Sequence, residues 1–407
     1  MLKVISLFSG AGGIDFGLEA AGFTTAVTLD FDSTCCNTLR MNREWPVLES
    51  DITNVSTKKL LSTASCTSGG VDLLVGGPPC QPFSKAGYWA SGDSLRLEDP
   101  RAFTIDEYLR VLEETLPKAF LLENVEGLSF SGKNEAVSLI LNKINEINKK
   151  HGTKYRAVYK VVNAAEYGVP QVRHRFIMIG SRDGIEFVFP ESSHGETASS
   201  KRKSFKTAWD AIGDVTPEPR EDLKLRGKWA DLLPSIPEGN NYLWHTDRGG
   251  GLALFGWRRR YWTFLLKLAK DRPSWTIQAQ PGPAIGPFHW ENRRLSMREL
   301  CRLQTFPDNV FISGGMGAIQ KQLGSAVPSL LAEILGREIK CQLLGLPRSR
   351  KKLLLLPNES DSYPKPERVK PVPTKFLPMV GDHEAHPGTG KGFAAISREP
   401  SLVGSGS

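Results

Sequence analysis

One cysteine, Cys80, lies between prolines in the run GGPPCQPFS, residues 76–84, which follows the apolar stretch Val71–Val75. The three prolines fix φ on both sides of the thiol and leave few backbone donors there. A nucleophilic thiolate needs a fixed backbone, exposure and nearby cationic or dipolar groups, whereas a structural cysteine is buried among apolar side chains. The segment alone is compatible with a reactive thiol and with a proline-rich turn that carries an inert one.

A glutamate follows a second apolar run. Glu123 and Asn124, in the sequence LLENVEG, come just after Ala119–Leu122, which is typical of a buried parallel strand. The carboxyl ends of parallel strands line the active crevice of an open sheet, so we expect Glu123 and Cys80 to face one cleft. A buried glutamate has a raised pKa and can donate a proton to a ring nitrogen. Taken alone, Glu123 fits equally well as a helix N-cap or a salt-bridge partner.

Three polar residues alternate along the segment YGVPQVRHR, namely Gln171, Arg173 and Arg175. This spacing places all three side chains on one face of an extended segment. A row of arginines that faces a cleft can bind a carboxylate, a phosphate or a carbonyl oxygen. The ordinary alternative is a solvated face of an edge strand.

A glycine-rich turn, FSGAGG, spans Phe8–Gly13 between an expected strand and an expected helix. The N-terminal amides of such a helix can face an anionic or polar ligand. The dinucleotide fingerprint GxGxxG would need a third glycine at position 15, where the sequence has Asp15. The turn therefore predicts a ligand site and disfavours NAD.

Two acidic residues follow the next expected strands. Asp30 and Phe31 end the second strand, and Asp51 and Ile52 follow a third. One acid can accept hydrogen bonds from both ribose hydroxyls, and the other can accept one from the adenine amino group. Each acid alone is more typical of a helix N-cap. Together with the glycine turn and the apolar neighbours, the set predicts an adenosine pocket.

The first half of the chain alternates strands and helices, as parallel α/β sheets do. The expected strands are Lys3–Phe8, Thr25–Leu29, Val71–Val75, Ala119–Leu122, Tyr155–Val162 and Phe176–Ile179. The expected helices are Ile14–Ala21, Val137–Ile147, Ser296–Leu303 and Pro328–Leu335. The pattern predicts an α/β fold whose first half carries the chemistry.

The pattern weakens after Gly180. Residues 186–290 are irregular, contain most of the tryptophans and carry the basic runs Lys201–Lys203 and Arg258–Arg260, which indicates a second domain. The sequence beyond residue 346 is basic and rich in proline, and it predicts a disordered tail over 346–407. The expected division is 1–185 with 318–343 as the catalytic domain, 186–290 as the second domain and 291–317 as a hinge and connecting helix.

Composition restricts the partners. The 407 residues carry a formal net charge of +8, which favours a polyanion. The six cysteines form no CxxC pair, so neither a zinc site nor a thioredoxin-type site is indicated, and we expect no metal. No signal peptide and no apolar run long enough for a bilayer are evident, which predicts a cytoplasmic protein with no membrane partner.

Six segments occur in the order typical of one family. They are FSGAGG, GGPPCQPFS, ENVEG, QVRHR, RRLSMRELCRLQTFPD (residues 293–308) and GSAVPS (residues 324–329). In this series the chain resembles the cytosine-5 DNA methyltransferases of prokaryotic restriction-modification systems, over roughly residues 1–336. The resemblance implies a Rossmann-like, S-adenosylmethionine-dependent methyltransferase sheet with a smaller, irregular target recognition domain.

The resemblance also implies a mechanism. The Cys80 thiolate would add to C6 of a cytosine while Glu123 binds N3 and the exocyclic amine, so that C5 becomes nucleophilic and takes a methyl group. Arg175 matches the arginine that holds the cytosine carbonyl oxygen, and Arg173 would lie close by. Because C5 and C6 cannot react inside a stacked duplex, the base must rotate out into the pocket.

The resemblance implies the cofactor S-adenosylmethionine, which becomes S-adenosylhomocysteine after the transfer. It also implies a set of residues that bind this cofactor. The implied residues are Phe8, Gly10, Gly12, Gly13, Asp30, Phe31, Asp51, Ile52, Ser325 and Ala326. Phe8 and Phe31 would contact the adenine, Asp30 the ribose and Asp51 the amino group. The family usually has asparagine where this chain has Ser325, and serine cannot replace both the donor and the acceptor of the amide.

The expected partner is double-stranded DNA. The implied contacts are Ser84, in a loop that would close over the flipped base through Asp99–Arg101, and Asn124, Gln171, Arg258, Arg259 and Arg260. A monomer is expected, in a bacterial or archaeal cell, with a cognate restriction endonuclease that acts separately. The alternatives are a transfer RNA methyltransferase of the same mechanism, a catalytically silent DNA-binding protein and, more distantly, an NAD-dependent oxidoreductase.

Overall fold

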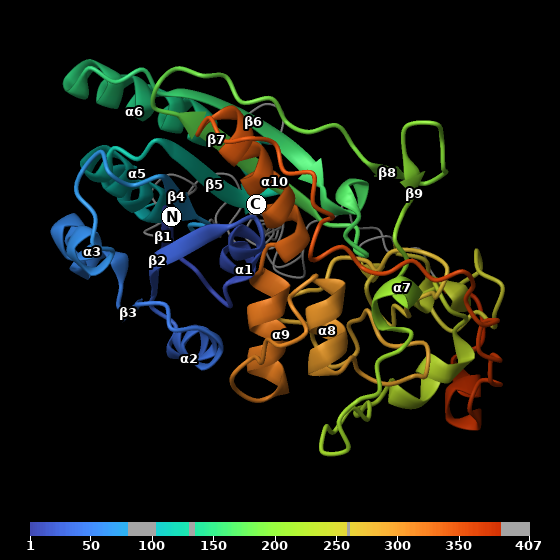
Figure 1. The fold of residues 1–407 in the computed structure, drawn as a ribbon. Helices are drawn as coiled ribbons and strands as arrows, with labels where there is room; N and C mark the ends of the chain where they lie inside the picture. The colour runs from blue at the N-terminus through green and yellow to red at the C-terminus, as the bar shows by residue number, and fades with distance from the viewer. Residues whose placement is uncertain (80–102, 130–134, 259–260, 384–407) are drawn as a thin grey trace, which may run out of the picture.

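The computed structural model describes residues 1–79, 103–129, 135–258 and 261–383. A seven-stranded sheet lies at its centre, with the strand order β3-β2-β1-β4-β5-β7-β6 (Figure 1). Helices cover both faces of this sheet, which confirms the predicted Rossmann-like α/β class. Four residues with expected roles, Cys80, Ser84, Arg259 and Arg260, lie outside the described residues, as does the loop around Ser84.

The elements match the sequence pattern closely. The sheet consists of β1 (Leu2–Leu7), β2 (Phe23–Asp30), β3 (Val47–Glu49), β4 (Leu73–Gly76), β5 (Ala119–Val125), β6 (Arg156–Asn163) and β7 (His174–Ser181). The α-helices are α1 (Gly13–Ala20), α2 (Ser33–Asn42), α3 (Thr57–Thr63), α5 (Phe103–Thr115), α6 (Glu135–His151), α7 (Ala208–Ile212), α8 (Met297–Leu303), α9 (Met316–Ser325) and α10 (Ser329–Gln342). Short elements are β8 (His194–Gly195), β9 (Lys203–Ser204) and the 3-10 helices η1 (Ile52–Asn54), η4 (Glu126–Ser129), η5 (Ala164–Tyr167), η6 (Ala230–Ser235), η7 (Tyr242–His245) and η9 (Thr374–Met379).

The alternating pattern of strands and helices indicated a parallel sheet, but one strand of the sheet runs antiparallel. Strands β3, β2, β1, β4 and β5 are parallel, whereas β7 runs antiparallel between β5 and β6. Parallel neighbours need a crossover of about a dozen residues or more, usually with a helix. The link between β6 and β7, residues 164–173, contains only the turn η5 and returns the chain beside its own strand.

Two apolar layers bury the sheet. On one face the side chains of β1, β2, β4 and β5 pack against α3, α5 and α6, and on the other face they pack against α1 and α10. The order of the strands reverses between β1 and β4, and in open α/β sheets ligands bind at this point, beyond the carboxyl ends of the strands. The glycine turn after β1 and the proline turn after β4 both lie there.

Helices α1 and α10 pack unusually closely. A Cβ atom at Gly17 of α1 would lie 2.6 Å from Cβ of Ala332 and 2.8 Å from the amide nitrogen of Glu333, both in α10. Only glycine leaves room for this approach. The contact places the amino end of α1, and with it the glycine turn, against the segment that precedes α10.

Residues 186–290 contain little regular structure, as their composition predicted. A separate core of nine buried side chains, most of them between Leu225 and Phe288, lies in this region. Not all of the predicted second domain packs there, because Ala208, Ala211 and Trp290 belong to a cluster with α8 and α9. We call the part around the separate core, residues 225–288, the recognition region.

The predicted disorder of the tail from residue 346 is wrong as far as residue 383. This segment contains the 3-10 helix η9, and Phe376 is buried in the core of the recognition region. Leu353, Leu355 and Leu356 pack against the layer that contains α10. The segment has no periodic core pattern because it contributes single side chains to cores that other parts of the chain form. Residues 384–407 lie outside the described residues.

In the described part of the chain, no helix has both the length and the apolar character needed to cross a bilayer. The same residues contain no group of three or more His, Cys, Asp or Glu side chains arranged to hold a metal ion.

The close packing of α1 on α10 predicts a steric effect of a single methyl group. We expect Gly17→Ala to lower the free energy of unfolding by about 1–3 kcal/mol, because packed helix atoms must move. Gly317→Ala is the matched control, since no atom lies within 4 Å of a Cβ placed there in α9, and it should be neutral or stabilise by up to about 1 kcal/mol. Urea unfolding measures both, and equal effects would contradict the packing argument.

Candidate active site

The turn after β4 leads directly to Cys80 and is held from two sides. Asn124 Nδ2 donates a hydrogen bond to the carbonyl of Pro78 at 3.0 Å, and Thr104 Oγ1 of α5 donates one to the carbonyl of Pro79 at 3.0 Å. Strand β4 pairs with β5 in parallel, with Gly76 beside Leu122, so the two strands end at the same edge. The residue before Cys80 is thus fixed next to the ENV segment. Asn124, expected at the DNA, donates here to the protein.

Glu123 lies against this same turn. A Cβ atom at Gly77 would lie 2.7 Å from Glu123 Oε2, so only glycine allows the carboxylate to rest on the backbone there. Glu123 is buried, and its Oε1 is 2.8 Å from Nε of Arg175 on β7. Burial raises the pKa of Glu123, and the guanidiniums of Arg175 and Arg173 oppose this rise. The structure therefore brings Glu123, Arg175 and the turn before Cys80 together, as predicted.

Arg173 is fully buried and joins three distant parts of the chain. Its guanidinium donates to the carbonyl of Ile277 at 3.2 Å, to that of Gly324 at 2.6 Å and to that of Ala326 at 2.8 Å. Ile277 lies in the last part of the recognition region, Gly324 in the last turn of α9, and Ala326 directly after that helix. Arg173 thus positions both segments beside Glu123.

Gln171 does not face the cleft. It is fully buried, its Nε2 donates to the carbonyl of Leu303 at 3.2 Å, and its Oε1 accepts from the amide of Ile277 at 3.1 Å. Both ends of the side-chain amide are used within the protein, so this placement does not support the expected contact with DNA. The alternation of residues 171, 173 and 175 could not distinguish buried donors from exposed ones.

The glycine turn after β1 is tied to the acid at the end of β2. The amide of Gly10 donates to Asp30 Oδ2 at 2.7 Å, and the amide of Asp32 donates to Asp30 Oδ1 at 2.9 Å. Phe8, Gly10 and Gly12 all have positive φ, and at Gly12 a Cβ would also lie 2.8 Å from Leu39. Burial raises the pKa of Asp30, and the two amide donors oppose this rise. Asp30 thereby fixes the turn.

The neighbourhood of this turn fits an adenosine group. None of the described residues comes within 4 Å of a Cβ placed at Gly10, and Phe31, directly after β2, is 67% exposed although it is apolar. Asp51 is exposed, accepts from the amide and hydroxyl of Thr53 and has a lowered pKa for that reason, while Ile52 beside it is buried. An exposed aromatic side chain near two carboxylates supplies groups that could contact a base and its ribose.

The last predicted cofactor segment lies on the opposite side of the glycine turn. Gly13 approaches the carbonyl of Val327 so closely that a side chain at position 13 would collide with it. Ser325 is exposed and ends α9, and Ala326 is half-buried. Lys321 of the same helix pairs with Asp32 at 2.7 Å, which connects α9 to the end of β2. No local pattern indicates this pair, because its members are far apart in the chain.

Asp15 is fully buried in the first turn of α1. In the sequence it was informative only as a departure from the dinucleotide fingerprint. Neither of its carboxylate oxygens has a hydrogen-bond partner among the residues that the structure describes. Burial raises the pKa of Asp15 from its ordinary value of 3.8 to about 7, against a smaller lowering effect of Ser6. No sequence signal could reveal this, since aspartate in a first helical turn is common.

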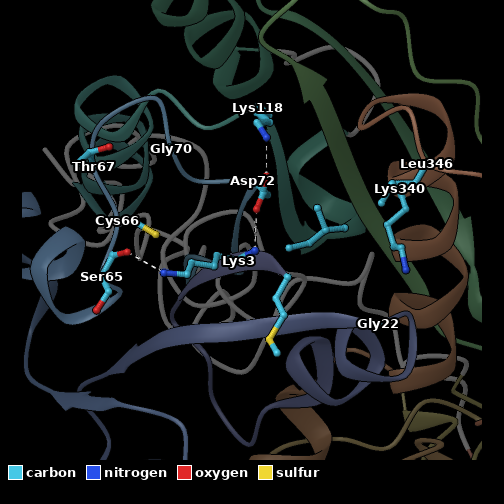
Figure 2. A pocket seen from close by; sticks show the side chains of 12 residues that line it. Lys3, Gly22, Ser65, Cys66, Thr67, Gly70, Asp72, Lys118, Lys340 and Leu346 are labelled. Carbon is cyan, nitrogen blue, oxygen red and sulfur yellow. Dashed lines mark hydrogen bonds and ion pairs between the residues drawn. The ribbon is translucent and has the colours of Figure 1, made fainter.

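Arg258 is exposed in the recognition region, and its neighbours Arg259 and Arg260 lie outside the described residues. Another opening, of about 870 Å³, lies at the amino-terminal edge of the sheet (Figure 2). Asp72 there pairs with Lys118 at 2.8 Å and accepts from the amide of Lys3 at 2.8 Å, while Lys340 donates to the carbonyl of Ala21. These lysines already bind protein oxygens at the far edge from Glu123, so this opening is separate from the candidate site.

Comparisons with known proteins agree with one another. The family C-5 cytosine-specific DNA methylase matches residues 2–341. The type II methyltransferase M.SacI of Streptomyces achromogenes is 39% identical over 371 residues, which cover 84% of this chain and 93% of that protein. The type II methyltransferase M1.HphI of Haemophilus parahaemolyticus is 35% identical over 353 residues, which cover 83% of this chain and 86% of that protein.

Solved structures share the fold. A prophage-encoded protein of Escherichia coli, described as a DNA modification methyltransferase, superposes with a TM-score of 0.61 at 20% identity, over 85% of this chain and all of that one. A methyltransferase of Entamoeba histolytica superposes with a TM-score of 0.55 at 17% identity, over 84% and 99%. At these identities the likeness supports the fold alone.

The position of Arg173 predicts a large structural cost when its charge is removed. Arg173→Met keeps much of the volume but leaves three carbonyls without their donor, and we expect it to lower the free energy of unfolding by about 3–5 kcal/mol. Arg156→Met is the control, because the Arg156 side chain is 57% exposed in its pair with Glu186, and the expected loss is below about 1 kcal/mol. Denaturant unfolding measures the loss of unfolding free energy in both variants. Equal losses would show that Arg173 does not stabilise the fold more than an exposed arginine does.

The buried Asp15 predicts a pH-dependent stability. Between its ordinary pKa of 3.8 and the folded value of about 7, the unfolded chain releases a proton that the folded chain keeps, so this residue lowers stability as pH rises. Asp15→Asn removes the effect, and its advantage over the unaltered protein should grow by about 3 kcal/mol between pH 5 and pH 8.

Asp51→Asn is the control for this measurement. Its hydrogen bonds lower the pKa of Asp51, so both states are ionised throughout that pH range and the difference from the unaltered protein should stay constant. Unfolding curves at pH 5 and pH 8 without ligand provide the measurement. A constant difference for Asp15→Asn as well would show that Asp15 is ionised in the folded protein.

Proposed function

The chain belongs to the C-5 cytosine-specific DNA methylases and is a DNA cytosine-5 methyltransferase of the type II modification kind, and on that premise we propose its chemistry in detail. The enzyme transfers a methyl group from S-adenosylmethionine to C5 of a flipped-out cytosine in a specific duplex sequence, through a covalent bond between Cys80 and C6. One observation carries the proposal: the buried Glu123 carboxyl lies on the turn that leads to Cys80 and is paired with Arg175.

A pyrimidine ring is a poor electrophile, so the chain must activate it. Burial raises the pKa of Glu123, which favours a carboxyl that holds a proton for N3, and its other oxygen can accept from the exocyclic amine. The Arg175 guanidinium, already beside Glu123, holds the carbonyl oxygen of the base. Withdrawal of electron density at N3 and at this oxygen makes C6 open to attack by the Cys80 thiolate.

Addition at C6 makes C5 nucleophilic. After C5 has gained the methyl group, a base or a water removes the proton from C5, and the bond between Cys80 and C6 breaks to restore the aromatic ring. The fixed turn before Cys80 supports this role, because Asn124 and Thr104 hold the backbone that carries the nucleophile.

The residues around the glycine turn would hold the cofactor. S-adenosylmethionine, when bound, supplies an electrophilic methyl group. Phe31 and Phe8 would contact the adenine, Asp30 the ribose and Asp51 the amino group, with Ile52 as an apolar wall. Ser325 and Ala326 would close the opposite side, next to Gly13. The space that the described residues leave beside Gly10 and the exposure of Phe31 support this assignment.

Duplex DNA is the substrate that the family implies. Rotation of the target base out of the stack is needed, because the thiolate and the methyl group must approach C6 and C5 from the faces of the ring, which neighbouring bases cover inside the duplex. The net charge of +8 favours DNA, and the exposed Arg258 of the recognition region is available to contact a base edge or a phosphate. A monomer that works beside a separate cognate endonuclease fits these features.

The proposed nucleophile has a direct test. We expect Cys80→Ser to lower methyl transfer by at least about 1,000-fold and to leave duplex binding intact, because the thiol acts only on the base. Cys341→Ser is the control, a free cysteine in α10 at which no loss is expected. Bisulfite sequencing of a plasmid exposed to each protein reports the product, the base and the sequence context. Full methylation by Cys80→Ser would exclude the covalent mechanism.

A further inference from the structure

The segment after α10 crosses from the catalytic part of the molecule to the recognition region. Figure 1 shows it in orange and red, passing from α10 towards the side that carries α7. We call residues 346–383 the C-terminal strap. The family match ends at residue 341, so the strap lies outside it.

The first end of the strap is fixed to α10. Glu333 is fully buried, and its two oxygens accept from the amide of Leu354 at 2.9 Å and from that of Leu355 at 3.0 Å. Arg337 pairs with Glu333 at 2.7 Å and also donates to the carbonyls of Lys351 and Lys352. A buried carboxylate is well satisfied here only while the strap is in place.

Two lysines and helix α7 contact the middle of the strap. Glu359 pairs with Lys203 at 3.4 Å and with Lys206 at 3.5 Å, and the amide of Ser360 donates to Asp210 of α7 at 2.8 Å. Exposed ion pairs add little stability by themselves. They keep the strap on one path along the surface.

The second end closes a buried charge pair in the recognition region. Lys270 and Glu238 have side chains that are each only 4% exposed and pair at 2.6 Å. Glu367 of the strap pairs with Lys270 at 3.2 Å, and its amide donates to Glu238 at 2.7 Å. Without the strap these two charges would lose both a partner and their cover.

Phe376 then fills the core of the recognition region. It is 3% exposed and stacks on Trp229, with ring centroids 5.7 Å apart at an angle of 15°. Trp229 contacts Phe264 at 5.7 Å, and Phe264 contacts Tyr242 at 5.5 Å. The hydroxyl of Tyr242 donates to the carbonyl of Arg258. A series of ring contacts therefore connects the strap to the backbone of Arg258.

We propose that the C-terminal strap is a positioning element for the DNA substrate: Phe376 completes the core that supports the Arg258 segment, and the attachment to α10 holds this core at a fixed place relative to Glu123. The described part of the recognition region has only the short 3-10 helices η6 and η7 as regular elements, so packing in its core contributes to its shape. The DNA part of the inference rests on the proposed function, whereas the packing part does not.

The test uses the full chain with three substitutions at the second end. Phe376→Ala removes the ring, Phe376→Leu keeps an apolar side chain, and Leu377→Ala is the matched control because Leu377 is 43% exposed. Limited trypsin digestion reports opening of the strap, which contains several lysines and arginines between 348 and 375. Steady-state methylation of a plasmid that the unaltered protein methylates gives KM for DNA, and calorimetry gives the affinity for S-adenosylmethionine.

We expect Phe376→Ala to speed cleavage within 348–375 on the order of 100-fold, because the open form becomes more populated. Its KM for plasmid DNA should rise by at least about tenfold, while affinity for S-adenosylmethionine stays within about twofold. Phe376→Leu should recover most of both effects, and Leu377→Ala should behave like the unaltered protein.

Two results would overturn the proposal. Trypsin rates that are the same for Phe376→Ala and Leu377→Ala would show that Phe376 does not hold the strap. Faster cleavage with an unchanged KM for DNA would show that the strap has no positioning role. If even the unaltered protein methylates no DNA, the proposed function fails, and the trypsin comparison still decides whether the strap packs as described.

Discussion

Three charged side chains, the buried Glu123 and Arg173 and the largely buried Arg175, lie together at the carboxyl ends of the parallel strands, and their need for partners constrains the segments around them. A charge removed from water costs several kcal/mol unless its hydrogen-bonding groups are satisfied. Glu123 and Arg175 form an ion pair, whereas Arg173 takes most of its acceptors from the backbone. These backbone acceptors come from segments more than 100 residues further along the chain, so the charge group can form only when the whole topology is in place.

This arrangement makes the two halves of the candidate site interdependent. Arg173 holds the end of α9, at Gly324 and Ala326, beside the strand that carries Arg175. On the other side, Asp30 fixes the glycine turn through the amide of Gly10. A cofactor that bound between these two segments would meet groups held in place by buried polar contacts. Such fixed positions suit a reaction that depends on the alignment of the reacting atoms.

The sequence predicted the sheet elements and the grouping of Glu123 with Arg175 because both depend on local signals: apolar runs, glycine turns and the rule that parallel strands end at one edge. It did not predict the placement of Gln171 and Arg173, since an alternating pattern says which residues share a face and not whether solvent or protein covers that face. The pattern also did not predict that β7 runs antiparallel, because this direction depends on the short link between β6 and β7. Asp15 and the pair of Lys321 with Asp32 depend on burial and on contacts distant in sequence, which no local pattern contains.

The C-terminal strap shows why composition misled most strongly at the end of the chain. A segment rich in proline and lysine buries too little apolar surface to fold alone, and that is the basis on which disorder is predicted. The argument fails when another part of the chain already offers a core with an open position. Phe376 then needs only one aromatic partner, Trp229, and Glu367 only one buried lysine to order the segment around them. The same dependence holds in reverse, because an irregular region such as residues 225–288 has few regular hydrogen bonds of its own and draws part of its shape from the strap that crosses it.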